Sequence, residues 1–215
     1  MDDKMLRQHV VDELDYEPSI DSAHIGVAVE DGVVTLTGRV STYAEKSLAE
    51  IAVKRVRGVR GIAEALTVDF GAPSPYSDDD IAKRALTVLD LNVLVPAGAV
   101  RVKVQHGWLT LTGEVEWDYQ RTAAVHDLKK LRGVVGITNN VLVKPRLSVD
   151  DIERRIKGAL QRCAEIEASS VTVSVKDGLV KLEGHVRSCS DRDAVEQAAW
   201  AAPGVVSIED HLRIA

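Results

Sequence analysis

In the stretch VAVEDGVVTLTGRV, residues 27–40, apolar and polar residues alternate on both sides of Asp31-Gly32. This pattern is typical of two β-strands joined by a tight hairpin turn. Similar stretches recur as VKVQHGWLTLTGEV at 102–115 and as VSVKDGLVKLEGHV at 173–186. The chain therefore repeats one hairpin three times, which indicates three copies of a single small unit.

Glycines extend the repeat beyond the hairpin. Three glycine series share the same two spacings of 75 and 71 residues. We interpret them as structural, because turns and helix ends favour residues that tolerate positive φ. The first series lies in the hairpin turn, the second is expected to close a strand, and the third is expected at the C′ position that ends a helix. They are Gly32, Gly107 and Gly178; Gly38, Gly113 and Gly184; and Gly58, Gly133 and Gly204.

Helical patterns flank each hairpin. Before the third hairpin, Ile152, Ile156, Leu160 and Cys163 fall at helical spacing, with Ser148 or Asp150 as the expected N-cap. A second helix is expected after each hairpin, over residues 42–57, 117–132 and 188–202, followed by a strand over 62–68, 137–143 and 208–214. The order αββαβ predicts an α+β fold of three tandem units, each a three-stranded sheet with two helices packed on one face.

Two linker-like segments divide the chain into three domains. Residues 71–77 read GAPSPYS, a linker composition, and Lys144-Pro145-Arg146 forms a shorter break. We therefore assign unit 1 to residues 1–70, unit 2 to 71–146 and unit 3 to 147–215.

Composition and charge restrict the function classes. Hydrophobic residues make up 45% and charged residues 28%, as in ordinary globular proteins. The net charge of −6 argues against a general nucleic-acid binder. Formal charges of −5, +2 and −3 for units 1, 2 and 3 single out unit 2 as the part that would not repel an anionic partner.

The cysteines and the apolar runs indicate a compartment. Cys163 and Cys189 are too few for a disulfide framework and are expected to be free thiols. No stretch resembles a signal peptide, and no run reaches the roughly 18 apolar residues of a membrane span. A cytoplasmic location without a transmembrane segment is the expectation, while the oligomeric state is left open.

Two groups in unit 2 are candidate binding residues. By alternation, Arg101, Lys103 and Trp108 lie on the sheet face that no helix covers, where they would form an anion-binding or interfacial patch. The alternative is a face that is solvated or packs on a neighbouring unit. Trp117 and Tyr119 begin the second helix and could contact lipid or a protein partner. A helix-start staple or an inter-domain contact explains them equally well.

No catalytic or metal-binding constellation emerges, and neither a cofactor nor a metal is expected. The six histidines lack metal-ligand spacing, and Asp78-Asp79-Asp80 lacks the alternating ligands of a calcium loop. Gly58 and Gly61 spell the GxxG of a KH domain, but the element order and the acidic chain argue against nucleic-acid binding. Repeated like surfaces suit avidity better than catalysis.

The alternating valines, the turn glycine, the Thr-Leu-Thr-Gly-x-Val strand end and the Gly-Val after the second helix resemble the BON domain, in three copies. The resemblance implies an αββαβ fold and a non-enzymatic binding module, associated with phospholipid surfaces and with osmotic or envelope stress. It leads us to expect binding of phospholipid or another anionic surface. A protein–protein scaffold, or a cytoplasmic sensor of potassium or another small ion, is the alternative.

Overall fold

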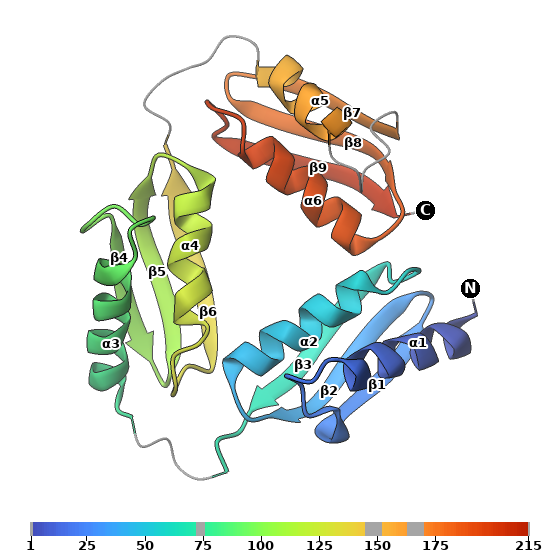
Figure 1. The fold of residues 1–215 in the computed structure, drawn as a ribbon, viewed down its shortest axis with the longest axis vertical. Helices are drawn as coiled ribbons and strands as arrows, with labels where there is room; N and C mark the ends of the chain where they lie inside the picture. Colours follow the sequence, from blue (N-terminus) through green and yellow to red (C-terminus); the bar gives the residue numbers. More distant parts are fainter. Residues whose placement is uncertain (1, 72–75, 145–151, 163–169, 215) are drawn as a thin grey trace.

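The computed structural model describes residues 2–71, 76–144, 152–162 and 170–214. Each unit has its own sheet and two helices (Figure 1), so the predicted α+β fold of three αββαβ units is confirmed. Unit 1 contains α1 (Asp3–Tyr16), β1 (Ile25–Glu30), β2 (Val33–Val40), α2 (Tyr43–Arg55) and β3 (Gly61–Val68), with a short 3₁₀ turn η1 (Ser22–His24). Unit 2 contains α3 (Asp78–Leu91), β4 (Val100–Gln105), β5 (Trp108–Val115), α4 (Asp118–Leu128) and β6 (Gly136–Val143). Unit 3 contains α5 (Ile152–Arg162), β7 (Val171–Lys176), β8 (Leu179–Val186), α6 (Cys189–Trp200) and β9 (Ser207–Ile214).

The three sheets share one mixed topology. In unit 1, β2 lies between β1 and β3, antiparallel to the first and parallel to the second, and the other two sheets repeat this order. The parallel pair follows from the second helix, which crosses from the end of β2 back to the start of β3. The mixed character was not part of the sequence prediction.

The predicted hairpin turns are confirmed. Asp31, His106 and Asp177 have φ near 50°, and the glycine after each has φ between 75° and 79°. Two successive positive φ angles define the type I′ turn that matches the twist of paired strands. A carboxylate from the first helix also holds the turn: Asp78 accepts hydrogen bonds from the backbone N–H groups of His106 and Gly107, both at 2.8 Å. Asp3 does the same in unit 1.

Two of the three glycine assignments need correction. Gly38, Gly113 and Gly184 do not close a strand: they lie inside β2, β5 and β8 with φ between 116° and 143°. A Cβ on Gly113 would stand 2.0 Å from the Ala99 carbonyl oxygen, so the backbones of β4 and β5 approach too closely there for any side chain.

The third glycine series does not occupy the C′ position of the second helix. That helix ends earlier than predicted, at Arg55, Leu128 and Trp200, and Gly58, Gly133 and Gly204 lie in the turn that follows. Bonds from N–H groups to the carbonyl three residues back, such as Val56 to Val53 and Leu131 to Leu128, replace the α-helical ladder and tighten the chain before each glycine. The positive φ expected of these glycines is present.

Several expectations fall outside the described residues: the N-cap at Ser148 or Asp150, the burial of Cys163 and most of the 71–77 linker. Cys189 carries a free thiol.

One hydrophobic core lies between the helices and the sheet of each unit. Its largest fully buried side chains are leucines and isoleucines, such as Leu36 in β2, Leu111 in β5 and Leu182 in β8. These residues point to the helix side, so the alternate residues of the same strands are left on the opposite face.

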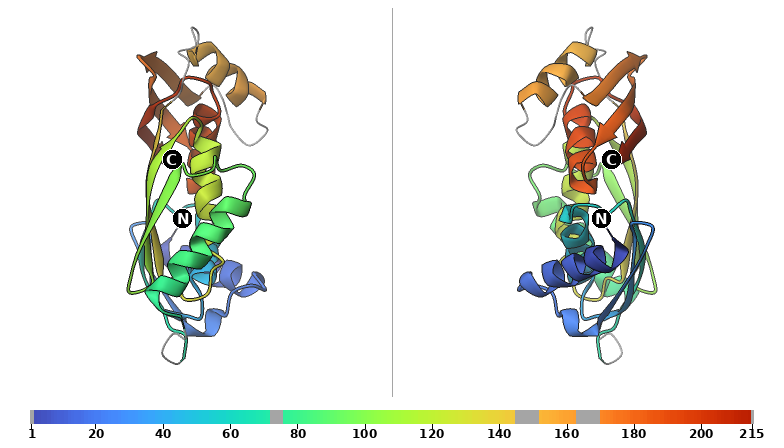
Figure 2. Two further views of the ribbon diagram at one scale, coloured as in Figure 1. Left: turned by 90° about the vertical axis from the view of Figure 1, so that its left-hand side faces the viewer. Right: turned by 90° about the vertical axis from the view of Figure 1, so that its right-hand side faces the viewer.

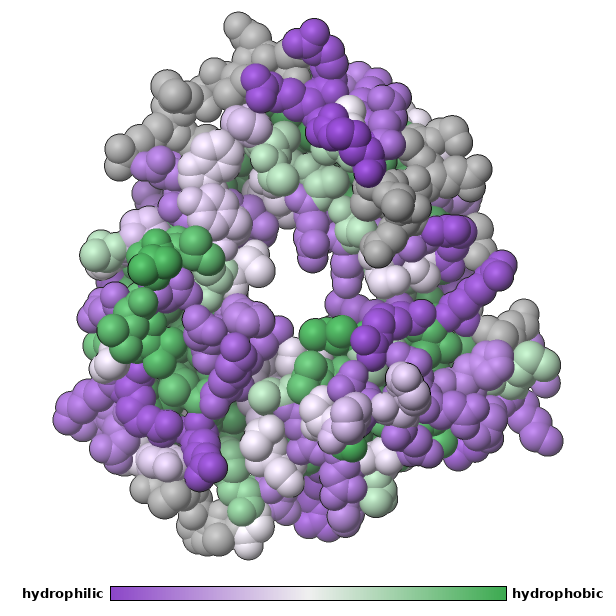
Figure 3. Space-filling model, in the orientation of Figure 1, coloured by the Kyte–Doolittle hydropathy of each residue, from purple (hydrophilic) through white to green (hydrophobic). Residues whose placement is uncertain are grey.

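The three units close into a ring. In Figure 1 the second helices α2, α4 and α6 turn inward, and Figure 3 shows an opening through the middle of the molecule. Lys54, Lys129 and Trp200 occupy equivalent positions near the ends of these helices, and each reaches the first half of a neighbouring second helix. Lys54 Nζ lies 3.4 Å from Asp193 Oδ2, Lys129 Nζ donates to Ser47 Oγ at 2.9 Å, and the Arg121 guanidinium lies 4.5 Å from the centre of the Trp200 ring. The same head-to-tail contact thus occurs three times, which is how a heterologous interface closes a ring.

Candidate binding surfaces

The open sheet face of unit 2 carries three of the five predicted binding residues. Arg101 and Lys103 on β4 lie opposite Thr112 and Thr110 of β5, and Trp108 lies two positions further along on the same face. Both basic side chains are exposed, and Trp108 keeps 47% of its surface accessible. The structure therefore brings Arg101, Lys103 and Trp108 onto one surface, as the alternation predicts.

Trp108 lies flat across the sheet. Its indole Nε1 donates to Thr138 Oγ1 on β6 at 2.9 Å, and a Cβ on Gly136 would meet the ring at 2.5 Å. Gly136 thus clears the space for the ring, and Thr138 fixes its orientation. A large flat apolar surface beside two cations can contact an interface that is itself part apolar and part anionic.

All three open sheet faces turn to the same side of the molecule, the sheet side. Figure 2 shows the strands along one side and α1, α3 and α5 along the other. The strand registers place six basic and four acidic residues on these open faces, an excess of two positive charges on a chain of net charge −6. The basic residues are Arg39, Arg101, Lys103, Lys176, Lys181 and Arg213; the acidic ones are Glu30, Glu114, Glu183 and Glu209.

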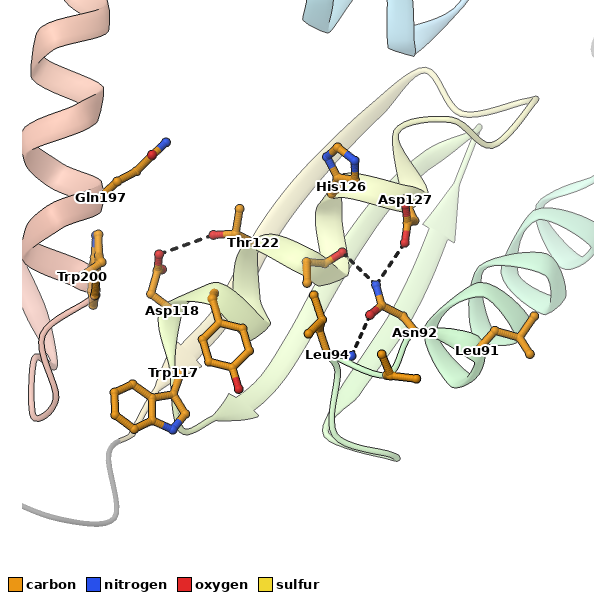
Figure 4. A pocket seen from close by; sticks show the side chains of 14 residues that line it. Leu91, Asn92, Leu94, Trp117, Asp118, Thr122, His126, Asp127, Gln197 and Trp200 are labelled. Atoms are coloured by element: carbon orange, nitrogen blue, oxygen red, sulfur yellow. Dashed lines mark hydrogen bonds between the residues drawn. The ribbon is translucent and has the colours of Figure 1, made fainter. Parts of the chain in front are cut away.

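Trp117 and Tyr119 lie elsewhere, on the helix layer of unit 2. Trp117 is the N-cap of α4 and is partly buried, whereas Tyr119 is 53% exposed. Together with Trp200 of α6 they line an open groove of about 1160 Å³ between units 2 and 3 (Figure 4). The five predicted residues therefore form two separate surfaces.

The loop after α3 forms the other wall of the groove, and sequence reasoning missed it. Leu91, the last residue of α3, and Val93 and Leu94 in this loop are large apolar residues, and Val93 is 96% exposed. The hydrophobic patch they form is visible on the helix side in Figure 3. Four apolar residues within Leu91–Val95 were the available signal, but an apolar run of this length reads equally well as a buried segment.

Asn92 holds this loop against α4. Its side-chain amide donates to Asp127 Oδ2 at 3.0 Å, and its side-chain oxygen accepts from the backbone N–H of Leu94 at 2.9 Å (Figure 4). The polar residue is thus turned inward, and the leucine and valine side chains beside it are held at the surface. An exposed apolar wall on a fixed loop is the feature of a docking surface rather than of a core.

Three polar residues beside the groove, Asp118, Arg121 and Thr122, contact one another. Asp118 Oδ1 lies 2.5 Å from Arg121 Nη2, which places the Arg121 guanidinium over the Trp200 ring. Thr122 donates to Asp118 at 3.4 Å. These contacts serve the junction between α4 and α6, and they leave the groove with an apolar character.

Within the described part of the chain, no three His, Cys, Asp or Glu side chains gather as a metal site would require. Asp78, Asp79 and Asp80 form the first turn of α3, as their sequence position indicates, and each has its own role. Asp78 holds the hairpin turn, Asp79 pairs with Lys83, and Asp80 completes a capping box with Ser77. Among the described helices, none is long and apolar enough to cross a membrane.

Fold and surfaces define a class of protein: a three-fold repeat of a small α+β domain that exposes a sheet side, with a cationic excess, and an apolar groove. The chain belongs to the BON-domain family, whose model matches residues 2–69, 77–145 and 148–215. The resemblance seen in the sequence is thereby confirmed.

A distant relative supports the same assignment. Over 148 aligned residues the chain is 28% identical to the osmotically-inducible protein Y of Escherichia coli (strain K12). The alignment covers 67% of this chain and 74% of the relative. Among solved structures, two of CdsD, described as a structural protein of the type III secretion system of Chlamydia trachomatis, align at 14% identity. These alignments cover 98% and 100% of this chain and 92% and 100% of the two CdsD chains. Their TM-scores are 0.27 and 0.26, and we base no argument on them.

Proposed function

We propose that this protein is a non-enzymatic binding protein that uses its sheet side to contact an anionic phospholipid surface under osmotic or envelope stress. The observation that carries the proposal is the common direction of the three open sheet faces, which concentrates a positive excess on one side of an acidic molecule. The name of the osmotically-inducible relative supports the stress context.

The charges set the expected strength of this contact. Each basic residue near an anionic membrane contributes about 1 kcal/mol, so a net excess of two yields weak and reversible attachment. Three similar faces held side by side raise the effective concentration of each contact, and Trp108 adds an interfacial anchor. Such binding weakens strongly with salt, because charges further apart than about 10 Å are screened at 0.1 M ionic strength.

Charge reversal on the sheet side tests the proposal. Arg101→Glu with Lys103→Glu changes the sheet side from an excess of two basic residues to an excess of two acidic ones. We expect co-sedimentation with vesicles of phosphatidylglycerol and phosphatidylcholine to be lost at low salt, whereas the native chain sediments with them and not with pure phosphatidylcholine.

The matched control is Lys4→Glu with Lys83→Glu, which changes the net charge equally but on α1 and α3, on the opposite side. This variant is expected to sediment like the native chain. Equal loss in both variants would show a non-specific effect of net charge. Absence of sedimentation by the native chain would exclude the lipid surface.

The groove favours a second candidate function, the docking of a protein partner. Exposed Leu91, Val93 and Leu94, facing Trp117 and Tyr119, offer an apolar surface without a basic excess. A partner held there would bind in a largely salt-independent manner, so the salt series of the vesicle experiment also separates the two candidates. The ion-sensor alternative stays a prediction of the sequence.

A further inference from the structure

A second cavity lies where unit 3 meets unit 1 and closes the ring. It has a volume of about 940 Å³ and is lined by Asp31, Val33 and Arg60 from unit 1 and by His185, Arg192, Leu212, Arg213 and Ile214 from unit 3. Three arginines and a histidine therefore surround one space, although Arg60 and Arg213 are far apart in the sequence.

Two of these arginines are available to a ligand. Among the described residues, no carboxylate lies within ion-pair distance of Arg60 or Arg213, and both side chains are exposed. Arg60 only reaches the backbone carbonyl of Asp31, at 3.5 Å. Arg192, by contrast, is paired with Asp210 of β9. The lining carries one carboxylate, that of Asp31, against three guanidinium groups.

The repeat provides an internal comparison for these positions. The residues equivalent to Arg60 are Val135 in unit 2 and Val206 in unit 3, and those equivalent to Arg213 are Thr67 and Leu142. The fold therefore accepts small or apolar side chains at both places. The two arginines are features of this one junction, and fold stability does not require them.

The remaining lining adds an apolar wall. Val33, Leu212 and Ile214 line the same cavity as the arginines. Guanidinium groups bind phosphate oxygens in a planar, bidentate manner, and the cavity is larger than a single inorganic phosphate needs. A smaller cavity of about 490 Å³, lined by Asp2 and Asp3, adjoins it and shares Asp31, Arg60 and Ile214 with it.

We propose that this junction cavity binds an organic phosphate, with the phosphate group on Arg60, Arg192 and Arg213 and the organic part against Val33, Leu212 and Ile214. The site is distinct from the sheet-side patch of unit 2 and needs both terminal units. Because the ligand would contact only the closed ring, binding stabilises the closed form in proportion to ligand concentration.

The experiment titrates the full chain with glycerol 3-phosphate by calorimetry and follows thermal unfolding in parallel, with NaCl at equal ionic strength as the blank. The site variant is Arg60→Val with Arg213→Thr, which places the residues of the other units at the two positions. The matched control is Arg101→Gln with Lys103→Gln, which removes two cations from the sheet face of unit 2 and leaves the junction intact.

We expect one site per chain, a thermal midpoint that rises with glycerol 3-phosphate, and a dissociation constant weakened at least about tenfold by the site variant but changed less than about twofold by the control. A native chain that shows neither heat nor a shift up to about 10 mM overturns the proposal, as does equal weakening in both variants.

Phosphatidylglycerol vesicles distinguish the source of the phosphate. The vesicle experiment uses Arg60→Val alone, because Arg213 is one of the basic residues of the sheet side. If Arg60→Val loses vesicle binding as well, the ligand is a lipid headgroup; if it loses only glycerol 3-phosphate, the ligand is a free phosphate ester. Arg60 is not among the basic residues of the sheet side, and Arg101 and Lys103 do not line the junction cavity, so each proposal can fail without the other.

Discussion

At the scale of single residues, glycine marks the places where the backbone has no room for a side chain. Gly113 lies in mid-strand at φ 143°, and a Cβ there would overlap the Ala99 carbonyl oxygen. Gly98, in the loop just before β4, also has a positive φ of 71°, but no atom lies within 4 Å of its would-be Cβ. The two positions separate the cost of backbone conformation from the cost of steric overlap.

We expect Gly98→Ala to lower the free energy of unfolding by about 1 kcal/mol, the cost of a left-handed conformation for an ordinary residue. Gly113→Ala should lower it by more than about 3 kcal/mol, because β4 and β5 must also move apart. Urea denaturation followed by tryptophan fluorescence measures both values. Similar losses in the two variants would contradict the close strand approach.

At the scale of elements, a polar contact joins the second helix to the last strand in each unit, and its chemistry differs among them. In unit 1, Lys46 Nζ lies 3.0 Å from Glu64 Oε2. In unit 3 the equivalent pair is Arg192 and Asp210, and α6 adds a second carboxylate, Glu196. Burial, together with the neighbouring Asp210, raises the pKa of Glu196 from 4.5 to about 7. Although burial opposes it, the hydrogen bonds from Glu196, the Leu212 N–H and Arg192 lower the pKa of Asp210.

This pair gives the unit a predictable pH dependence. A carboxyl whose pKa is raised by folding binds its proton more tightly in the folded state, so its stabilising effect is complete below pH 4.5 and is lost as the pH rises through 7. Glu196→Gln keeps a neutral hydrogen-bond donor at all pH values. We expect the variant to match the native protein at low pH and to be more stable at pH 8. Because the Glu196 side chain is partly in water, the gain is about 1 kcal/mol, or roughly 2–4 °C in thermal midpoint. A midpoint difference that is the same at both pH values would rule out this titration.

At the scale of the whole molecule, the ring depends on contacts between residues far apart in the chain. Lys54 and Asp193 join units 1 and 3, and the Cys189 thiol donates to the Val59 carbonyl at 3.4 Å across the same junction. Burial favours a lower pKa for Lys54, but the negative charges of Asp193 and Glu50 beside it outweigh burial, so the pKa of Lys54 is raised. The charge of Lys54 is thus retained at this junction.

We expect Asp193→Lys to open the ring, because it replaces an attraction of about 0.5–1 kcal/mol by a repulsion of similar size. Energy transfer between dyes placed near the two termini should fall. The reciprocal variant Lys54→Glu with Asp193→Lys should restore it, since the pair is present again with its charges exchanged. Unchanged transfer in the single variant would show that apolar contacts alone close the junction.

Much of the fold follows from local patterns. Strand alternation placed Arg101, Lys103 and Trp108 on one face, and Asp-Gly and His-Gly placed the hairpin turns. The position of Gly113 inside a strand could not be seen in the same way, because its conformation depends on the approach of Ala99, the residue just before β4. The groove was missed for a related reason: Leu91–Val95 is an apolar run whose exposure depends on Asn92 holding the loop against α4.

The sequence by itself determined the triplication, the element order of each unit and the sheet faces, because these depend on periodicities within a few residues. Only the tertiary structure decided that the sheets face one way, that the units close into a ring and that Arg60, Arg192 and Arg213 meet. The physical reason is that such contacts join exposed side chains of different units. A residue that packs across a junction has the same local pattern as one that faces water.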